Sequence, residues 1–298
     1  MNIPLPSSKL AALAFMSVWS LLAMQSASTA PLNLRDTPIF LNENVAPLNM
    51  LVVGRDHKLY YEAYNDASDL DGDGALDVGF KPTITYYGYF QSNVCYNYAS
   101  SQYSPAGGAG ALNTCSGLWS GNWLNYMTTA RIDALRKVLY GGRRFLDSAT
   151  DTVLERTHIP QDAHSWGKQY ISTAVDGYDI AQYAPLSQPP AGRRHLFANT
   201  TLLGDGSQLP RFRVATNRVE PIWEWVSKER PVAGGNTISA SISPTDYIVR
   251  VQVCVPGVDF TVGDPNDRSG CRRYPDGNYK PTGLLHDYGE SDAMLFGL

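Results

Sequence analysis

The sequence predicts an α/β fold, and three stretches support this prediction. Leu48 to Gly54 is a short apolar run between turn-forming residues, which is typical of a buried strand. Trp123 to Tyr140 places apolar side chains at helical spacing, with Ser120 or Asn122 as the cap at its start and the pair Gly141-Gly142 as its stop. Tyr247 to Val255 alternates apolar and polar residues, which predicts a strand whose Arg250 and Gln252 face solvent or a polar neighbour.

Composition limits the possible functions. With 298 residues, 43% of them hydrophobic, the chain can form one large domain or two ordinary domains with proper cores. The 26 glycines and 19 prolines indicate much turn and loop structure. A formal net charge of −4 shows no basic excess, so nucleic acid is not an expected partner.

The amino terminus has the pattern of a secretory signal, assigned to residues 1–30. Lys9 precedes an apolar run, Leu10 to Met24, that is short for a membrane span, and small residues follow up to Ala30. Cleavage after Ala30 or slightly earlier fits this pattern, and an uncleaved membrane anchor is the alternative. No later stretch is apolar enough to cross a bilayer, so we expect an exported protein without a transmembrane segment after signal removal.

The four cysteines are expected to form disulfides in an exported chain. Cys95 with Cys115 and Cys254 with Cys271 are the local pairings among three possible connectivities. Each would close a loop of about 20 residues and restrict the unfolded chain by roughly 3 kcal/mol. A zinc site is the competing idea, but no C-x-x-C spacing supports it.

Further elements are expected along the chain. Their order is a strand or aromatic hairpin at Pro82 to Phe90, an exposed loop at Ser100 to Ala111, a short helix beginning near Ser148 or at Thr152, where Thr152 to Glu155 has capping-box spacing, strands at His195 to Leu203 and Phe212 to Ala215, a helical turn at Thr282 to Tyr288, and a strand starting at Met294. The chain ends inside that last apolar run, from which we expect it to be a fragment.

An acidic loop carries the clearest chemical signal. Asp69, Asp71 and Asp73 occupy the first, third and fifth positions of a calcium loop, and Asp77 occupies the ninth. Ala75 is expected to contribute its backbone carbonyl. So many carboxylates in one short segment repel each other unless a cation lies among them. Calcium, which takes six to eight oxygen ligands, is the expected ion, and magnesium fits less well.

The acidic loop departs from an EF-hand at its end. The twelfth position is Phe80, so the bidentate Glu of an EF-hand is missing, and Asn65, Asp66 or a water is expected to complete the shell. The alternative interpretation is an acidic, solvated turn, because Asp and Gly also form turns without a metal.

Several short motifs together resemble one known family. They are Asp69 to Asp77, Tyr86-Tyr87-Gly88-Tyr89-Phe90 with Cys95, Ser120-Gly121-Asn122-Trp123-Leu124-Asn125, Arg131 to Arg136, Ile159 to Trp166, Trp223-Glu224-Trp225 and Lys280 to Leu285. In combination they are similar to the amino-terminal region of the PilC/PilY family, the type IV pilus tip-associated adhesins and biogenesis factors.

This resemblance implies a von Willebrand A-like domain over residues 31–298, incomplete and interrupted by large β and loop insertions that carry the calcium loop and the disulfides. The family's carboxyl-terminal β-propeller is expected to be absent. One departure matters: the adhesion metal motif D-x-S-x-S would fall at Asp56 to Tyr60, which lacks both serines. A metal site of the adhesion type is therefore not expected there.

The resemblance and the acidic loop together predict a secreted calcium-binding component of the type IV pilus machinery, with a role in pilus assembly, adhesion or twitching motility. Expected partners are pilins or minor pilins and host or abiotic surfaces, and the expected location is the periplasm, outer membrane surface or pilus tip. A purely structural calcium-stabilised module is one alternative. Another is an exported hydrolase, but its histidines (His57, His158, His164, His195, His286) stand in no known catalytic motif, so we do not expect an enzyme.

Overall fold

The computed structural model describes residues 46–54, 56–159, 164–200, 209–222, 244–264, 269–291 and 293–297. All of them belong to the unit Ala46–Leu298. The predicted signal peptide, the Trp223-Glu224-Trp225 motif and most of the segment around it lie outside the described residues.

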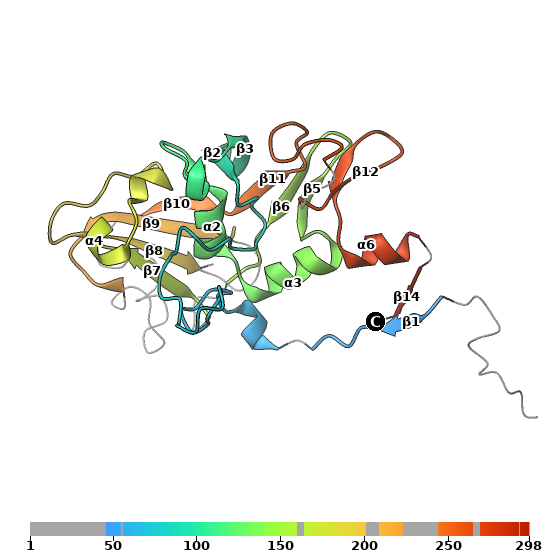
Figure 1. Cartoon of the computed structure of the whole chain (residues 1–298), viewed down its shortest axis with the longest axis horizontal. Helices are drawn as coiled ribbons and strands as arrows, with labels where there is room; N and C mark the ends of the chain where they lie inside the picture. The colour runs from blue at the N-terminus through green and yellow to red at the C-terminus, as the bar shows by residue number, and fades with distance from the viewer. Residues whose placement is uncertain are drawn as a thin grey trace, which may run out of the picture. The chain divides into compact units, whose positions relative to one another are not determined.

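Two sheets of unequal size contain most of the described strands (Figure 1). The six-stranded sheet runs in the order β4 (Trp119–Ser120), β2 (Val94–Ala99), β3 (Gln102–Gly108), β11 (Arg250–Val253), β6 (Thr152–Glu155) and β5 (Arg144–Asp147). The four-stranded sheet runs in the order β10 (Thr245–Ile248), β9 (Arg211–Arg218), β8 (Arg194–Thr200) and β7 (Trp166–Tyr170). All neighbours are antiparallel except β11 and β3. With the helices, this is a mixed α/β fold, as predicted.

The predicted strand at Tyr247 to Val255 is divided between these two sheets. The break falls at Val249, whose N–H donates to the carbonyl of Pro210 (2.9 Å) and whose carbonyl accepts from Arg156 N (3.0 Å). Arg250 and Gln252 meet polar neighbours as predicted, because they bond to Glu155 and Asp151.

Helices α2 (Gly121–Thr128) and α3 (Arg131–Tyr140) replace the single helix predicted from Trp123 to Tyr140. The prediction was wrong at the junction, because the segment Tyr61–Ala63 takes the backbone groups there. Ala63 N donates to the carbonyl of Thr129 (3.0 Å), and Arg131 N donates to the carbonyl of Tyr61 (3.1 Å). The predicted ends are confirmed: Ser120 Oγ caps α2, and Gly141 ends α3 in the left-handed conformation.

The core lies around α2, which is buried along its whole length between the two sheets (Figure 1). Trp123 contacts both sheets, with ring centroids 5.8 Å from Trp119 of β4 and 5.2 Å from Phe197 of β8. Most of the large buried side chains are aromatic, and they include Tyr86, Phe90, Tyr96, Tyr103, Tyr170, Tyr183 and Phe212. Eight of the 18 tyrosines are buried in this core, and four others pack against it.

Two local predictions were wrong because pairing partners outweighed local propensity. Ser100 to Ala111 is mostly the second half of a hairpin, in which Ser100 and Ser101 adopt positive φ values (50° and 61°) and Tyr103 is fully buried. Thr152 to Glu155 has capping-box spacing but forms β6, with all four residues buried between β5 and β11.

The segment Pro82 to Phe90 was predicted as a strand or hairpin but forms turns. Asn122 and Asn125 of α2 bond its backbone in place of a neighbouring strand. Asn122 bonds Tyr86 N and the Ile84 carbonyl, both at 2.8 Å, and Asn125 bonds Phe90 N and the carbonyls of Tyr86 and Phe90 at 2.9–3.1 Å. The tyrosine-rich motif and the Ser-Gly-Asn-Trp-Leu-Asn motif thus form one structural unit, which we call the α2 clamp.

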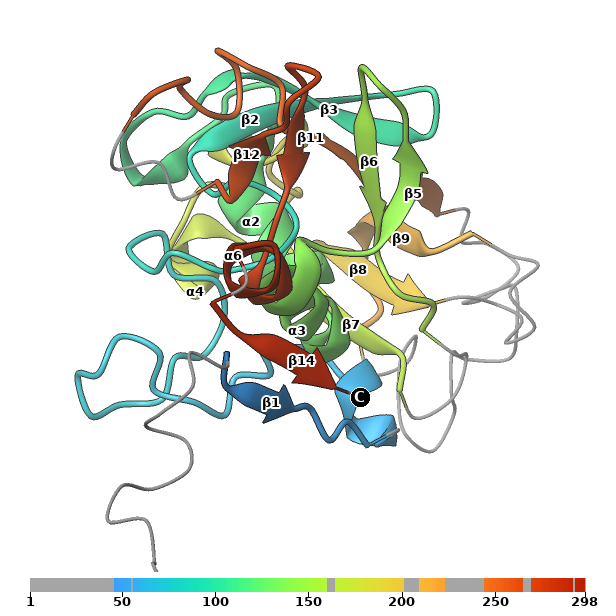
Figure 2. The same cartoon turned by 90° about the vertical axis from the view of Figure 1, so that its right-hand side faces the viewer.

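Strand β1 (Leu48–Met50) pairs in parallel with β14 (Leu295–Gly297) beside α3 and α6 (Leu284–Gly289) (Figure 2). The prediction of a buried first strand was wrong: Leu48 is 66% exposed and Val52 is 93% exposed. The physical reason is that β1 pairs only with β14 and is exposed at all three positions, so among the described residues no second sheet layer covers its apolar side chains. The predicted helical turn and terminal strand are confirmed as α6 and β14.

The remaining elements are short. They are η2 (His57–Tyr60), η3 (Ala111–Asn113), α4 (Thr173–Asp176), η4 (Ile180–Gln182), β12 (Cys271–Arg273) and β13 (Tyr279–Pro281). Both local disulfides form, Cys95–Cys115 and Cys254–Cys271. Within the described residues, no helix has the length and apolar character needed to cross a membrane.

Candidate functional site

Three carboxylates of the predicted calcium loop converge. Asp69, Asp71 and Asp77 each place one oxygen within 4.8 Å of the others. Calcium binds oxygen at 2.3–2.6 Å, so two ligands of one ion can be separated by up to about 5 Å. The donor set is all oxygen and negatively charged, which suits a hard divalent cation. These three predicted residues therefore fit a single calcium ion.

Asp73 is not part of the converging group. Its Oδ1 accepts a hydrogen bond from Ala75 N at 2.8 Å, which shapes the turn. Asp73 and the carbonyl of Ala75 as ligands both remain predictions.

The backbone of the acidic loop turns its N–H groups toward the carboxylates. Gly72 and Gly74 adopt φ values of 81° and 90°, which favour glycine. Their N–H groups donate to the two oxygens of Asp69 at 2.6 and 2.9 Å, and Leu70 N donates to Asp77 Oδ2 at 2.7 Å. These bonds offset part of the repulsion between the carboxylates and hold the loop in a shape that gathers them.

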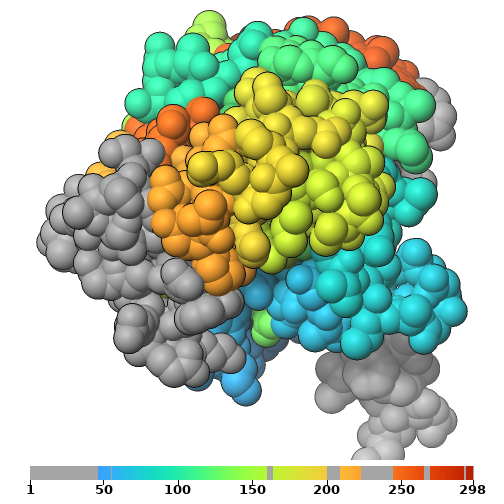
Figure 3. All heavy atoms as spheres, turned by 90° about the vertical axis from the view of Figure 1, so that its left-hand side faces the viewer, coloured from blue at the N-terminus to red at the C-terminus, as the bar shows by residue number. Residues whose placement is uncertain are grey.

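The base of the loop is anchored in the protein core. Asp66 Oδ1 accepts from Gly79 N (3.0 Å) and from the hydroxyl of Tyr126 (3.1 Å). Phe80, at the position of the missing EF-hand Glu, is 2% exposed and lies with its ring 5.0 Å from that of Tyr183. The tip, in contrast, is at the surface, where the residues of this region project in Figure 3 (cyan). A surface loop with a core anchor can order its ligands without a closing Glu.

Asp66 was predicted as a possible additional ligand. Together with Asn65, Ser68 and Asp77 it lines a small cavity of about 10 Å³, room for about one water. Asp77, at 8% exposed, therefore faces the converging carboxylates and also borders this cavity. A water-mediated ligand at this position remains a prediction.

A half-buried lysine lies beside the base of the loop. Lys168 Nζ donates to the carbonyl of Tyr64 at 2.5 Å and lies 3.7 Å from the centroid of the Tyr126 ring. Burial lowers the pKa of Lys168 to about 8, and the charges of Asp66 and Glu62 act in the opposite direction. Sequence reasoning missed Lys168 and Tyr126, because they contact positions 104 and 60 residues away and no local motif marks them.

Four of the five histidines have mainly structural contacts. His195 Nε2 bonds the Ser187 carbonyl (2.7 Å), and its Nδ1 accepts from Asn217 N (3.2 Å), while burial lowers its pKa. His286 accepts from Gly283 N at the start of α6. His57 and His164 contact each other at the surface, with ring nitrogens 3.3 Å apart.

Asp56, the first position of the comparison with the adhesion metal motif, has a local structural role. Asp56 Oδ1 accepts from Lys58 N at 2.9 Å and thereby caps η2. The loss of both serines from the D-x-S-x-S pattern thus coincides with a capping role for its aspartate.

Comparison with known proteins gives consistent results. The profile of the family described as PilY1 homolog, small alpha/beta domain, matches residues 77–215, which include α2, α3 and both motifs of the α2 clamp. Two Xylella fastidiosa (strain Temecula1 / ATCC 700964) proteins named type IV pilus biogenesis factor PilY1 homolog are also similar. One is 53% identical over 84% of this chain, the other 28% identical over 70%.

In both cases the chain spans only 17% of the relative's length. No solved structure matches. The family profile and the two relatives agree with the resemblance found in the motifs, and we conclude that the chain belongs to the PilY1 homologue family, the PilC/PilY family of the sequence analysis.

Proposed function

We propose that this chain is a secreted, calcium-binding component of the type IV pilus machinery that acts in pilus assembly, adhesion or twitching motility without catalysing a reaction. Its family membership and the name of its two relatives, type IV pilus biogenesis factor, support the pilus role. The two disulfides fit an oxidising compartment outside the cytoplasm, in agreement with the proposed signal peptide at residues 1–30. Pilins or minor pilins are the proposed partners.

The convergence of Asp69, Asp71 and Asp77 is the single observation that carries the calcium proposal. In this proposal these side chains hold the ion, Asp73 and the carbonyl of Ala75 complete the protein ligands, and water fills the rest of the shell. Calcium would neutralise the carboxylates and so stabilise the loop on its core anchor. The ordered loop would then present a fixed surface to a partner.

We further propose that β1 and β14 are strands of an incomplete von Willebrand A-like domain. Their parallel pairing supports this, because Asn49 and Met294 are in contact although 245 positions separate them. The segment between the two strands, with the calcium loop, both sheets and both disulfides, would then be a large insertion. The exposed apolar side chains of β1 are consistent with a sheet that continues in a longer protein.

Calcium-dependent thermal stabilisation of the purified chain tests the metal site. A ligand at 100 times its Kd stabilises the folded state by about 2.7 kcal/mol, which raises Tm by several degrees for a chain of this size. We expect this rise in the wild type and its loss in the double variant Asp69→Asn, Asp71→Asn. Asparagine keeps the size of the side chain and one oxygen acceptor, so the variant removes charge with little change in loop shape.

Two further variants sharpen this test. Asp276→Asn removes an exposed carboxylate from another turn and should leave the calcium response unchanged. Asp73→Asn should weaken the calcium response less than Asp71→Asn, because only Asp71 belongs to the converging group. A full calcium response in the double variant would remove the acidic loop from the proposed function.

A permanently bound, purely structural calcium ion is the alternative role for the same site. Binding of the chain to pilin, measured over a range of free calcium concentrations, distinguishes the two roles. If calcium is regulatory, pilin affinity should follow calcium occupancy while the chain stays folded. If calcium is structural, pilin binding should be lost only together with the folded state.

A further inference from the structure

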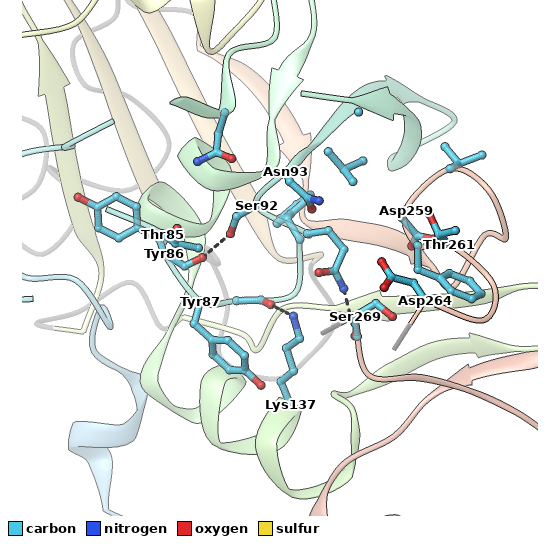
Figure 4. A pocket seen from close by; sticks show the side chains of 18 of the residues that line it. Thr85, Tyr86, Tyr87, Ser92, Asn93, Lys137, Asp259, Thr261, Asp264 and Ser269 are labelled. Carbon is cyan, nitrogen blue, oxygen red and sulfur yellow. Dashed lines mark hydrogen bonds between the residues drawn. The ribbon is translucent and has the colours of Figure 1, made fainter. Parts of the chain in front are cut away.

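A second concave site lies away from the acidic loop. It is a cleft of about 690 Å³ whose walls come from α3, from residues 85–94 and from residues 257–264 (Figure 4). Its volume is within the range of about 300–1,000 Å³ that is typical of ligand sites. Asp69, Asp71 and Asp77 do not line it, so this cleft and the candidate calcium site are separate.

The walls of the cleft are tied to the core. The Cys95–Cys115 disulfide lies next to Val94, which lines one side, and the Cys254–Cys271 disulfide closes the loop that supplies the other side. On the first side the backbone of residues 84–90 is held by the two asparagines of α2. On the second side Phe260 is 7% exposed and packs 4.9 Å from the ring of Tyr279. The cleft is therefore largely preformed, which lowers the cost of ordering it around a ligand.

One side of the cleft carries a cation. Lys137 Nζ donates to the carbonyl of Gly88 and lies 4.7 Å from the centroid of the Tyr87 ring. Among the ion pairs of the described residues, none within 4.0 Å involves Lys137. Burial lowers the pKa of Lys137 to about 8, against the effect of Asp259. The positive charge of its ammonium group is thus stabilised by a carbonyl group and an aromatic ring. A carboxylate would stabilise this charge more strongly.

The opposite side carries anions. Figure 4 shows Asp259 and Asp264 across the cleft from Lys137. The carboxylate of Asp259 is held by the N–H groups of Cys254 and Val255, both at 2.7 Å. The polar side chains of Gln91 and Asn93 also line the cleft, and Gln91 Nε2 donates to the carbonyl of Ser269 at 3.1 Å. The cleft thus has a positive side, a negative side and hydrogen-bonding groups in its lining.

We propose that this cleft binds a dipolar peptide, with a carboxylate of the peptide toward Lys137 and an ammonium or guanidinium group toward Asp264 and Asp259. The amide side chains of Gln91 and Asn93 in the lining can bond the peptide groups of the ligand, and the ring of Tyr87 can contact its aliphatic part. A ligand with only one sign of charge would meet repulsion at one end of the cleft. This inference goes beyond the proposed function and does not depend on calcium.

Two sources can supply this chemistry: the ends of a short free peptide, or charged side chains within a segment of a partner protein. Unblocked Ala-Gly-Ala represents the first source, and Ac-Lys-Gly-Glu-NH2 represents the second. Titration calorimetry with the full chain measures the affinity of each. The matched probes for the first peptide are its acetylated form and its amidated form, and those for the second replace Lys or Glu by Ala.

We expect at least one dipolar probe to bind about tenfold more tightly than either of its singly charged forms, and the tighter of the two identifies the source. Lys137→Met should abolish the gain in affinity that the peptide's carboxylate confers, whereas Lys137→Arg should keep most of this gain. Asp264→Asn should reduce the advantage that the ammonium confers. Lys81→Met, outside the cleft, should change neither, and circular dichroism confirms that each variant is folded.

Three outcomes would overturn the proposal: no binding of either dipolar probe at millimolar concentration, equal binding of charged and blocked forms, or an unchanged carboxylate preference in folded Lys137→Met. The double variant Asp69→Asn, Asp71→Asn should bind the peptides normally. Its result separates a failure of the cleft proposal from a failure of the calcium proposal.

Discussion

Asn125 of α2 is the side chain whose removal should reveal most about how this fold is held together. It is fully buried, its Oδ1 accepts from Phe90 N at 3.1 Å, and its Nδ2 donates to the carbonyls of Tyr86 and Phe90, both at 2.9 Å. The variant Asn125→Ala leaves Phe90 N and the Phe90 carbonyl without their partner, whereas the Tyr86 carbonyl keeps a hydrogen bond from the hydroxyl of Ser92 (2.8 Å). A buried polar group without a partner costs about 1–3 kcal/mol, and some relaxation is expected, so we predict a loss of about 3–5 kcal/mol.

The variant Asn122→Ala, in the same helix, provides a comparison for this predicted loss of stability. Its side chain bonds two backbone groups, Tyr86 N and the Ile84 carbonyl. Asn122→Ala should therefore cost about 2–3 kcal/mol, less than Asn125→Ala. Asn97, which is exposed on β2, is the control, and its replacement by Ala should change stability by less than about 0.5 kcal/mol.

Urea unfolding followed by circular dichroism and tryptophan fluorescence measures these losses. Gly88→Ala tests the same contact from the opposite side, because a Cβ there would lie 2.2 Å from Asn125 Oδ1 and 2.3 Å from Thr129 Oγ1. The Gly88 and Asn125 variants should be less than additive when combined, since both disturb one clamp. A loss below about 1 kcal/mol in Asn125→Ala, or a larger loss in Asn122→Ala, would refute this account of the clamp.

Three other predictions concern the rest of the fold. Replacing Cys254 and Cys271 by Ala together should lower the free energy of unfolding by about 3 kcal/mol, as seen in urea titrations, because the disulfide closes a loop with a sequence separation of 17; an unchanged midpoint would contradict this. Lys168 has a pKa lowered from 10.5 to about 8, so between these pH values the unfolded chain holds a proton that the folded chain has released. Stability of the wild type relative to Lys168→Met should therefore rise from pH 8 to pH 10, and a flat or falling difference in unfolding free energy would argue against it. Gly141→Ala should lower Tm more than Gly277→Ala: both positions have positive φ (80° and 93°), but a Cβ at Gly141 would lie 2.5 Å from backbone atoms, whereas at Gly277 its nearest neighbour would be 3.8 Å away. Equal losses of Tm in the two variants would contradict this prediction, because they would show that only the backbone strain of a positive φ, and not the close contact with backbone atoms, lowers stability.

Sequence patterns predicted a structural feature correctly wherever the residues that form it lie close together in the sequence. The Ser120 cap, the Gly141 stop and the α6 turn are all decided within a few residues, and they are confirmed. The two disulfides follow the same rule, since each joins cysteines about 20 positions apart. The grouping of Asp69, Asp71 and Asp77 was predictable for this reason too, because one short loop contains all three carboxylates.

Predictions were wrong where distant segments compete for backbone groups. The aromatic alternation of Pro82 to Phe90 favours a strand, but Asn122 and Asn125 take its N–H and carbonyl groups. The helical spacing of Trp123 to Tyr140 continues across Thr129, but Tyr61 to Ala63 pairs with the backbone there. In each case the deciding partner is at least 30 positions away, and periodicity contains no information about it.

The sequence by itself determined the turns, caps, disulfides and the acidic loop, because each depends on side chains and glycines that lie within about 20 positions of one another. Only the tertiary structure decided that the first strand is exposed beside β14, that one helix becomes two, and that Lys137 faces Asp259 and Asp264 across a cleft. The physical reason is that burial and long-range pairing determine these features, and both arise only when the sheets and α2 pack together.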